Sequence, residues 1–455
     1  MADAFLRATA MTSKWVQRAA ELAADIWATV KFVVACLVSP IGMPIVAWRA
    51  MANHTRAKAE VGVFPAQVAA LDAGLPLVGP HARVRRLDAA QPLFITSDLH
   101  RCYRGRRDIP GLQGTKPLYA AILAQYERTG HHVVENGDVE DFWVVGGSPY
   151  GQWYDAARVA TRLVPGRVGR ELRRALLRRH LRLIGANNIE VQRTVARLAA
   201  AGRYHRTVGN HDDVFLDPGL AQDLARENGG SAPVDFVVLD ADDGSAAAVV
   251  THGHQTDGWN APGRSMLGQL ASWVANTISD VPGLESPDAM LSRNATLAYL
   301  RGQLPNRLLQ VHHRFGTNSK YDSLDEEWLF DAFGGAADDG PWLLMGHTHL
   351  PVKQPLSRTG VPWRRYANSG NGIWAGMITG LEWTGGPAGE PLPVAWVVVD
   401  GPDLEALVPD GATTIERGGR AVARRVMRPT ADGAHLEVDP ERSVEPIGST
   451  ALQEA

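Results

Sequence analysis

The sequence predicts a mixed α/β fold, because short apolar segments of strand type alternate with longer segments of helical periodicity. Leu93 to Thr96 is apolar and partly β-branched, which is typical of a buried strand. Four later segments share this character: Val133 to Asn136, Tyr204 to Val208, Ala247 to Thr251 and Trp342 to Met345. Tyr154 to Leu198 carries a helical pattern instead. With 455 residues, 45% of them hydrophobic, the chain can bury a large core.

Each strand-type segment is followed by residues that can bind a metal ion. Asp98 and His100 come directly after the first segment, and their spacing of two points both side chains the same way on an extended backbone. The other segments lead into Gly137-Asp138-Val139-Glu140-Asp141, Gly209-Asn210-His211-Asp212, His252-Gly253-His254 and Gly346-His347-Thr348-His349. Glycine in these turns lets the backbone come close to an ion. Five such segments in one chain predict a shared metal site.

In this order, the five motifs resemble those of the calcineurin-like metallophosphoesterase family, over roughly residues 92 to 400. The resemblance implies an αββα sandwich of four layers with a dinuclear metal centre. It implies that the first metal is held by Asp98, His100 and His349, that Asp138 bridges the two metals, and that the second is held by Asn210, His252 and His347. It also implies that His211 is the catalytic histidine and Asp141 its carboxylate partner.

These residue types suit hydrolysis at phosphorus. Two divalent ions about 3.5–4 Å apart can clamp the attacking and leaving oxygens of an in-line displacement, with a bridging hydroxide as the expected nucleophile. His211 directly follows Asn210, so it can donate a proton to the leaving group while Asp141 holds its imidazole in the useful tautomer. Mixed nitrogen and oxygen ligands suit Mn, Fe, Zn, Ni or Co. We therefore expect a metal-dependent hydrolase of phosphate esters or anhydrides.

Three further residues are candidates for substrate binding. Arg101 either neutralises a phosphate oxygen or lies on a solvated loop, and His254 is the second histidine of its motif. Asp257, in the turn after His252, contacts substrate or supports a metal ligand. The chain resembles the branch of the family that holds UDP-diacylglucosamine pyrophosphatase more than protein serine/threonine phosphatases. The latter carry Arg-Gly where this chain has Phe142-Trp143.

The remaining segments suggest a domain organisation. We expect an N-terminal helical arm over residues 1–58, a linker over 59–91, the metallophosphoesterase domain over 92–427 with helical insertions at about 150–200 and 258–335, and a mobile C-terminal tail over 428–455. Ile26 to Trp48 is apolar with one charge, and it either contacts a membrane interface or packs on the sandwich. Two cysteines without a C-x-x-C pair are compatible with a reducing compartment, so we expect a cytoplasmic protein, and membrane contact by the apolar arm would make it peripherally membrane-associated.

The segment from Arg158 to Arg182 holds nine arginines and one acidic residue, Glu171. This segment is either a solvated basic face or a recognition site for an anionic headgroup, a membrane surface or a substrate phosphate. The expected partners are a phosphorylated small-molecule or lipid-linked substrate and an anionic membrane surface. Nucleic acid is disfavoured, because the formal net charge is −3 and aromatic residues that could stack bases are scarce in the segment. Alternative functions are a catalytically silent scaffold for protein binding and a nucleic-acid phosphodiesterase.

Overall fold

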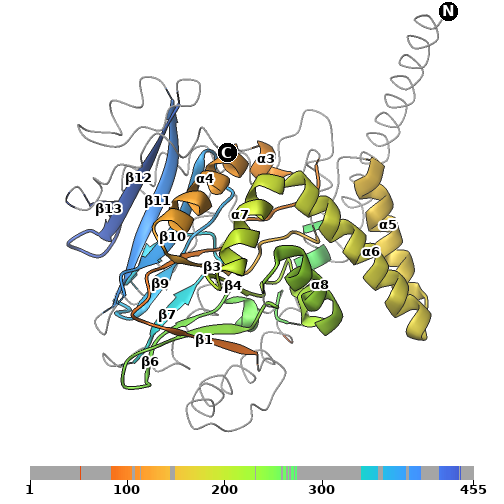
Figure 1. Cartoon of the computed structure of the whole chain (residues 1–455), viewed down its shortest axis with the longest axis horizontal. Coiled ribbons are helices and arrows are strands. Elements are labelled where there is room, and N and C mark those ends of the chain that lie inside the picture. The colour runs from red at the N-terminus through yellow and green to blue at the C-terminus, as the bar shows by residue number, and fades with distance from the viewer. Residues whose placement is uncertain are drawn as a thin grey trace, which may run out of the picture.

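The computed structural model describes Ala52 and, with short internal gaps, residues 83–273, 340–400 and 420–441. The described part is mixed α/β and contains two mixed sheets (Figure 1). The N-terminal arm expected over residues 1–58, apart from Ala52, lies outside the described residues. Most of the second insertion and the last residues of the expected tail lie outside them as well.

The two sheets are built from segments that alternate along the chain. The six-stranded sheet has the order β1 (Val84–Asp88), β5 (Phe236–Asp240), β6 (Ala246–Val250), β7 (Trp342–Met345), β9 (Tyr366–Asn368) and β8 (Val352–Lys353). The seven-stranded sheet has the order β13 (Leu436–Val438), β12 (Arg420–Pro429), β11 (Pro391–Asp400), β10 (Met377–Trp383), β2 (Leu93–Thr96), β3 (His132–Asn136) and β4 (Tyr204–Thr207). Strands β2, β3 and β4 run parallel to one another, as do β6, β7 and β9.

The helices lie mainly in the first half of the described chain. They are α3 (Ile109–Leu112), α4 (Thr115–Arg128), α5 (Pro149–Leu163), α6 (Gly166–Asn187), α7 (Ile189–Ala200) and α8 (Pro218–Asn228), with short 3-10 turns η1 (Asp213–Leu216) and η2 (His254–Thr256). Helices α4 and α7 lie over the seven-stranded sheet (Figure 1), and their apolar residues join Phe94 and Val133 in one buried cluster. Asp217 begins α8, because its side chain accepts hydrogen bonds from the backbone N–H groups of Gly219 and Leu220.

The two sheets share buried apolar clusters. One cluster joins Ile95 and Val134 of the seven-stranded sheet to Val237 and Val250 of the six-stranded sheet. Alternate residues of β5 enter different clusters, so both faces of the six-stranded sheet are buried. The described residues thus contain one helical layer and two packed sheets, which is compatible with an α/β sandwich.

The sheets extend beyond the expected domain boundaries at both ends. Strand β1 lies within residues 59–91, expected to be a linker, and pairs in parallel with β5 from Val84 opposite Phe236. Strand β13 lies within the expected tail and pairs with β12. Both strands are short and lie at an end of their sheet. The partner of β1 is remote in sequence, whereas β13 pairs with β12 across a short connection.

The first expected insertion, at about 150–200, is helical. Residues 149–200 form three helices, with breaks around Pro165 and at Asn188. Strands β9 and β11 follow late in the chain and belong to different sheets, because β10 lies in the seven-stranded sheet between β11 and β2.

Ile95 provides a test of the packing between the sheets. Its side chain is fully buried in the cluster that both sheets share, so Ile95→Ala should lower the free energy of unfolding by about 2–5 kcal/mol. Val159 on α5 is 57% exposed, and Val159→Ala should change stability by no more than about 0.5 kcal/mol. Urea denaturation of both variants measures the difference. Equal midpoints for the two variants would contradict the described core.

Candidate metal centre

The predicted ligand residues lie where five strands end. Strands β2, β3 and β4 are parallel neighbours in one sheet, and β6 and β7 are parallel neighbours in the other, so their carboxyl ends form two adjacent rows. Backbone hydrogen bonds connect the loops that follow, from His100 N–H to the Asp138 carbonyl (2.9 Å) and from Gly346 N–H to the His252 carbonyl (3.0 Å). The loops therefore hold their side chains over one small region.

The backbone of these loops adopts conformations that L-residues rarely take. Among the described residues, six non-glycine residues have positive φ, and five of them are predicted metal ligands: Asp98 (54°), His100 (45°), Asp138 (52°), His347 (69°) and His349 (57°). Left-handed backbone at a non-glycine residue costs free energy and persists where the surrounding structure enforces it, typically at functional sites. The strain is thus concentrated on the residues that the sequence marks as ligands.

The first group of ligand atoms comes from Asp98, His100 and His349. His349 Nε2 lies 3.1 Å from Asp98 Oδ1 and 3.3 Å from His100 Nε2. Two donors that bind one ion at about 2.1 Å are themselves about 3.0–3.4 Å apart, so these separations fit a shared metal. Asp98 Oδ2 accepts hydrogen bonds from Ser97 Oγ and from the His347 backbone N–H, whereas Oδ1 has no hydrogen-bond donor and remains available to an ion.

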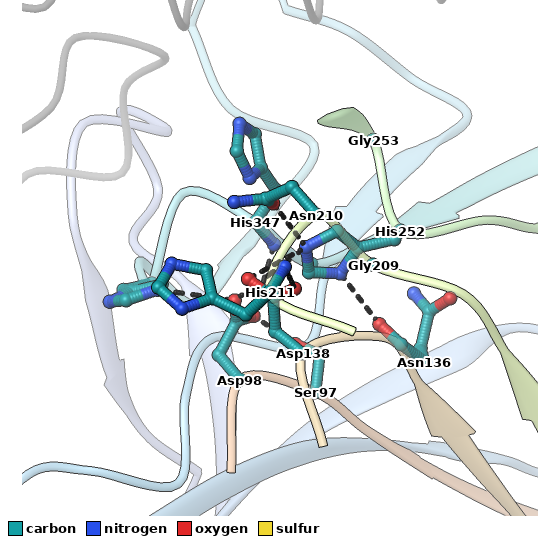
Figure 2. A network of polar contacts seen from close by, with 12 residues as sticks. Ser97, Asp98, Asn136, Asp138, Gly209, Asn210, His211, His252, Gly253 and His347 are labelled. Atoms are coloured by element: carbon teal, nitrogen blue, oxygen red, sulfur yellow. Dashed lines mark hydrogen bonds and ion pairs between the residues drawn. The ribbon is translucent and has the colours of Figure 1, made fainter. Parts of the chain in front are cut away.

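The second group comes from Asp138, His252 and His347, with Asn210 beside them. His252 Nε2 lies 3.3 Å from Asp138 Oδ2 and 3.3 Å from Asn210 Oδ1. Figure 2 shows the side chains of Asp98, Asp138 and His252 directed toward one another. Asp138 Oδ2 is also 4.0 Å from His100 Nε2, which places this carboxylate between the two groups.

Neighbouring groups fix the orientation of the histidine rings. His252 Nδ1 donates to the Asn136 carbonyl at 2.8 Å (Figure 2), which leaves Nε2 to face Asp138. His100 Nδ1 lies 3.0 Å from Asp141 Oδ2, which leaves its Nε2 for the first group. Such partners on the far ring nitrogen select the tautomer that can bind a metal.

Two glycines let the strand ends approach this closely. A Cβ at Gly209 would lie 2.2 Å from Asp138 Oδ1, and a Cβ at Gly137 would lie 2.6 Å from the His252 ring. Gly137 also has a φ of 75°. Any larger residue at either position would displace a ligand side chain.

His211 stands beside both groups without belonging to the two sets of expected ligands. Its Nδ1 lies 3.0 Å from Asp141 Oδ2, and its backbone N–H donates to Asp138 Oδ1 at 2.7 Å. Burial lowers the pKa of His211, but the charges of Asp141 and Asp138 outweigh burial and raise that pKa to about 9. Asp141 is shared, because the same Oδ2 also contacts His100, a contact that the sequence did not reveal.

The carboxylates of the site stay ionised despite their burial. Burial by itself raises the pKa of Asp98 and of Asp138, yet the neighbouring histidines lower both pKa values, that of Asp138 well below its usual range. Asp98, Asp138 and Asp141 are each at most 1% exposed. Buried His and Asp clusters of this kind could hold metal ions, since nitrogen and oxygen donors with negative charge are what divalent transition metals bind.

Arg101 does not lie where a substrate phosphate could reach it. The prediction that it contacts substrate is wrong, because its guanidinium is buried and donates to Glu135 (3.0 Å) and Glu140 (2.8 Å). Neither does it lie on a solvated loop, the other prediction, since it is 3% exposed. The backbone of Arg101 pairs with that of Val139, and this pairing directs the side chain away from the ligand groups.

His254 and Asp257 are both buried beside the second group. The His254 ring centroid lies 5.3 Å from that of His252 and 6.3 Å from that of His347. Asp257 Oδ2 lies 3.1 Å from His347 Nε2, so Asp257 holds the ring of a predicted ligand. Its position supports the second of its two predicted roles, the support of a metal ligand.

A buried ionic network beneath the ligand loops was not predicted from sequence. Arg206 pairs with Glu140 and with Asp212 Oδ2, the latter at 2.6 Å. Asp212 in turn accepts hydrogen bonds from the backbone N–H groups of Val139 (3.0 Å) and Gly209 (2.6 Å). The sequence contains one signal for this network. Two of the ligand motifs include an acidic residue, Glu140 and Asp212, to which no metal-binding role is assigned.

Glu140 tests the structural role of this network. It lies between Arg101 and Arg206, so Glu140→Gln should cost about 1–3 kcal/mol of stability by removing one of the two carboxylates that each buried guanidinium contacts. Thermal unfolding of the metal-free variants measures the loss. Glu190, exposed in the first turn of α7, is the control, and Glu190→Gln should cost a few tenths of a kcal/mol.

Asp138 tests the metal assignment. Because its carboxylate lies between the two groups, Asp138→Asn should lower the affinity for both ions, whereas His349→Ala should weaken one ion only. Elemental analysis after dialysis against a fixed concentration of manganese gives the stoichiometry. An Asp138→Asn protein that retains the wild-type metal content would contradict the position assigned to this residue.

None of the helices in the described part of the chain combines the length and the apolar character needed to cross a membrane. Comparison with family models and with curated proteins gives no match for this chain.

Proposed function

We propose that this protein is a metal-dependent hydrolase of phosphate esters or anhydrides, with the four-layer αββα architecture and dinuclear centre of the calcineurin-like metallophosphoesterases. One observation carries the proposal. Seven residues chosen from five separate motifs gather at the ends of five strands, in two groups that Asp138 connects. The left-handed backbone conformation of five of these residues also supports the proposal, because such strain is retained mainly where function requires it.

The donor set suits two divalent ions such as Mn, Fe, Zn, Ni or Co. Asp98, His100 and His349 would hold one ion, Asn210, His252 and His347 the other, and Asp138 both. When bound, such ions polarise phosphoryl oxygens and lower the pKa of coordinated water. Three atoms fit this assignment. Asp98 Oδ1 has no hydrogen-bond partner. His252 and His100 each contact a neighbour through Nδ1, so their Nε2 atoms can bind an ion.

His211 is suited to give a proton to the leaving group. With Nδ1–H donated to Asp141, its Nε2 is the nitrogen that can carry and release the second proton. The raised pKa of His211, caused by the charges of Asp141 and Asp138 against the effect of burial, keeps the imidazolium populated at neutral pH. Trp143 stacks on the ring at a centroid distance of 4.2 Å and limits its motion. This side of the centre would therefore receive the leaving alkoxide or phosphate.

A hydrolysis screen tests the proposal. The full-length protein, supplied with each of the five metals in turn, is assayed with p-nitrophenyl phosphate, bis(p-nitrophenyl) phosphate and a nucleoside diphosphate sugar. Together these cover monoesters, diesters and pyrophosphates. Turnover that depends on added metal is the expected result. Absence of turnover on all three classes with a full metal complement would contradict the proposal and favour a scaffold role.

His211→Ala separates proton donation from metal binding. Because His211 is not among the proposed ligands of either ion, the variant should keep its metal content while kcat falls about 10²–10⁴-fold. Elemental analysis and steady-state kinetics on the same preparation measure both quantities. Trp143→Phe, which keeps an aromatic ring over His211, serves as a control and should retain most of the activity. Unchanged kcat in His211→Ala would rule out its role as the acid.

A further inference from the structure

Beside the candidate metal centre lies a cavity of about 510 Å³ between α5, α6, η1 and the start of α8. Five arginines line it: Arg158, Arg162, Arg170, Arg173 and Arg174. Its acidic lining residues are Asp213 and Asp217. Positive charge thus exceeds negative charge in a chain whose formal net charge is −3.

The arginines of α6 differ in their partners. Arg174 pairs with Asp217 at 2.8 Å, Arg178 pairs with Asp223 and Arg182 pairs with Glu227 at 3.6 Å, so these three attach α6 to α8. Arg170 and Arg173 form no ion pair with any described residue, although both line the cavity. The segment is therefore not a uniform solvated basic face. Some of its arginines form ion pairs within the fold, and others line the cavity.

The arginines of α5 add to the uncompensated charge. Arg158 donates to the Phe142 carbonyl at 3.2 Å and Arg162 to the side-chain oxygen of Gln269 at 2.8 Å, and both partners are neutral. Burial and the repulsion of Arg158 and Arg173 lower the pKa of Arg162. The nearby Asp213 accepts a hydrogen bond from Ser265 Oγ, and Asp213 and Asp217 together offset only part of the charge of the five arginines.

The cavity adjoins the catalytic side of the metal centre. Trp143 lines the cavity and stacks on the His211 ring, and Phe142, another lining residue, donates its backbone N–H to the His211 carbonyl at 3.2 Å. Leu177 and Leu220 supply apolar wall. A molecule whose leaving group meets His211 would therefore extend past an aromatic ring toward the guanidinium groups.

We propose that this cavity binds a second, phosphate-type anion of the substrate, so that the substrate carries one phosphoryl group at the metal centre and another anionic phosphate near Arg162, Arg170 and Arg173. The inference rests on the proposed function. Guanidinium groups present paired N–H donors that match the oxygens of a phosphate, and several together offset its charge. The anion can belong to a soluble metabolite or to a lipid headgroup, since both present the same oxygens.

Protection from phenylglyoxal tests the anion site without reliance on turnover. The full-length protein is modified in the presence of inorganic phosphate or of sodium chloride at equal ionic strength, and labelled peptides are quantified by mass spectrometry. Phosphate at about five times its dissociation constant should slow modification of Arg162, Arg170 and Arg173 about sixfold. The exposed Arg167, on the same helix but outside the cavity lining, should react equally in both salts.

Two variants sharpen this measurement. The double variant Arg170→Ala/Arg173→Ala should remove the protection of Arg162, whereas the matched variant Arg167→Ala should retain it. Vesicles of phosphatidic acid replace inorganic phosphate in a second arm, with phosphatidylcholine as the neutral control, and identify a lipid source if they alone protect. Equal reaction of Arg162, Arg170 and Arg173 with and without both anions overturns the proposal.

A matched pair of esters links the site to the substrate. Thymidine 5′-(phenyl phosphate) and its derivative with a phosphonomethyl group at the para position of the phenyl ring share the same reacting diester, and the second carries an additional anion on the leaving group. The phosphonate should raise kcat/KM about tenfold or more in wild type, and Arg170→Ala/Arg173→Ala should remove most of that advantage. Hydrolysis of both esters at equal kcat/KM would overturn the inference while leaving the proposed function intact. Hydrolysis of neither ester, nor of bis(p-nitrophenyl) phosphate, would overturn both.

Discussion

The site depends on the concentration of negative charge at buried strand ends. Asp98, Asp138 and Asp141 are almost completely buried, and each lies within 3.3 Å of a histidine nitrogen. Carboxylates this far from water must be compensated by positive charge, since an unpaired buried ion costs several kcal/mol. His211 and His252, whose pKa values the neighbouring carboxylates raise to about 9, supply part of that charge, and divalent ions would supply it more fully. The left-handed backbone of the ligand loops is the conformational cost of placing these groups together.

A second layer of charge beneath the ligands keeps the loops in place. Arg206 and Arg101 both contact Glu140, and Asp212 connects this network to the backbone N–H groups of Val139 and Gly209, in two of the ligand loops. These contacts make the loops more rigid. They also account for the direction of Arg101, because a guanidinium next to His100 is more strongly stabilised by two buried carboxylates than by solvent.

Trp143, which precedes the helical insertion and packs against it, connects the insertion to the candidate metal centre. Trp143 contacts His211 on one side and the arginine-lined cavity on the other. Helices α5 and α6 extend to one side of the sheets (Figure 1), and the ion pairs of Arg174 and Arg178 attach α6 to α8. Because this attachment uses only part of the basic residues, the same helices can both stabilise the insertion and present charge to a ligand.

The sequence by itself predicted strands that end in candidate metal ligands. Leu93 to Thr96 and Trp342 to Met345 are strands as predicted, since short apolar runs bounded by polar and turn-forming residues are local signals. Tertiary structure alone decided the pairing of β1 with β5 and the sharing of Asp141 by two histidines. It also decided which arginines of α6 form ion pairs within the described part of the chain. These outcomes depend on contacts between segments far apart in the chain, and a local pattern carries no information about which distant partner a side chain will meet.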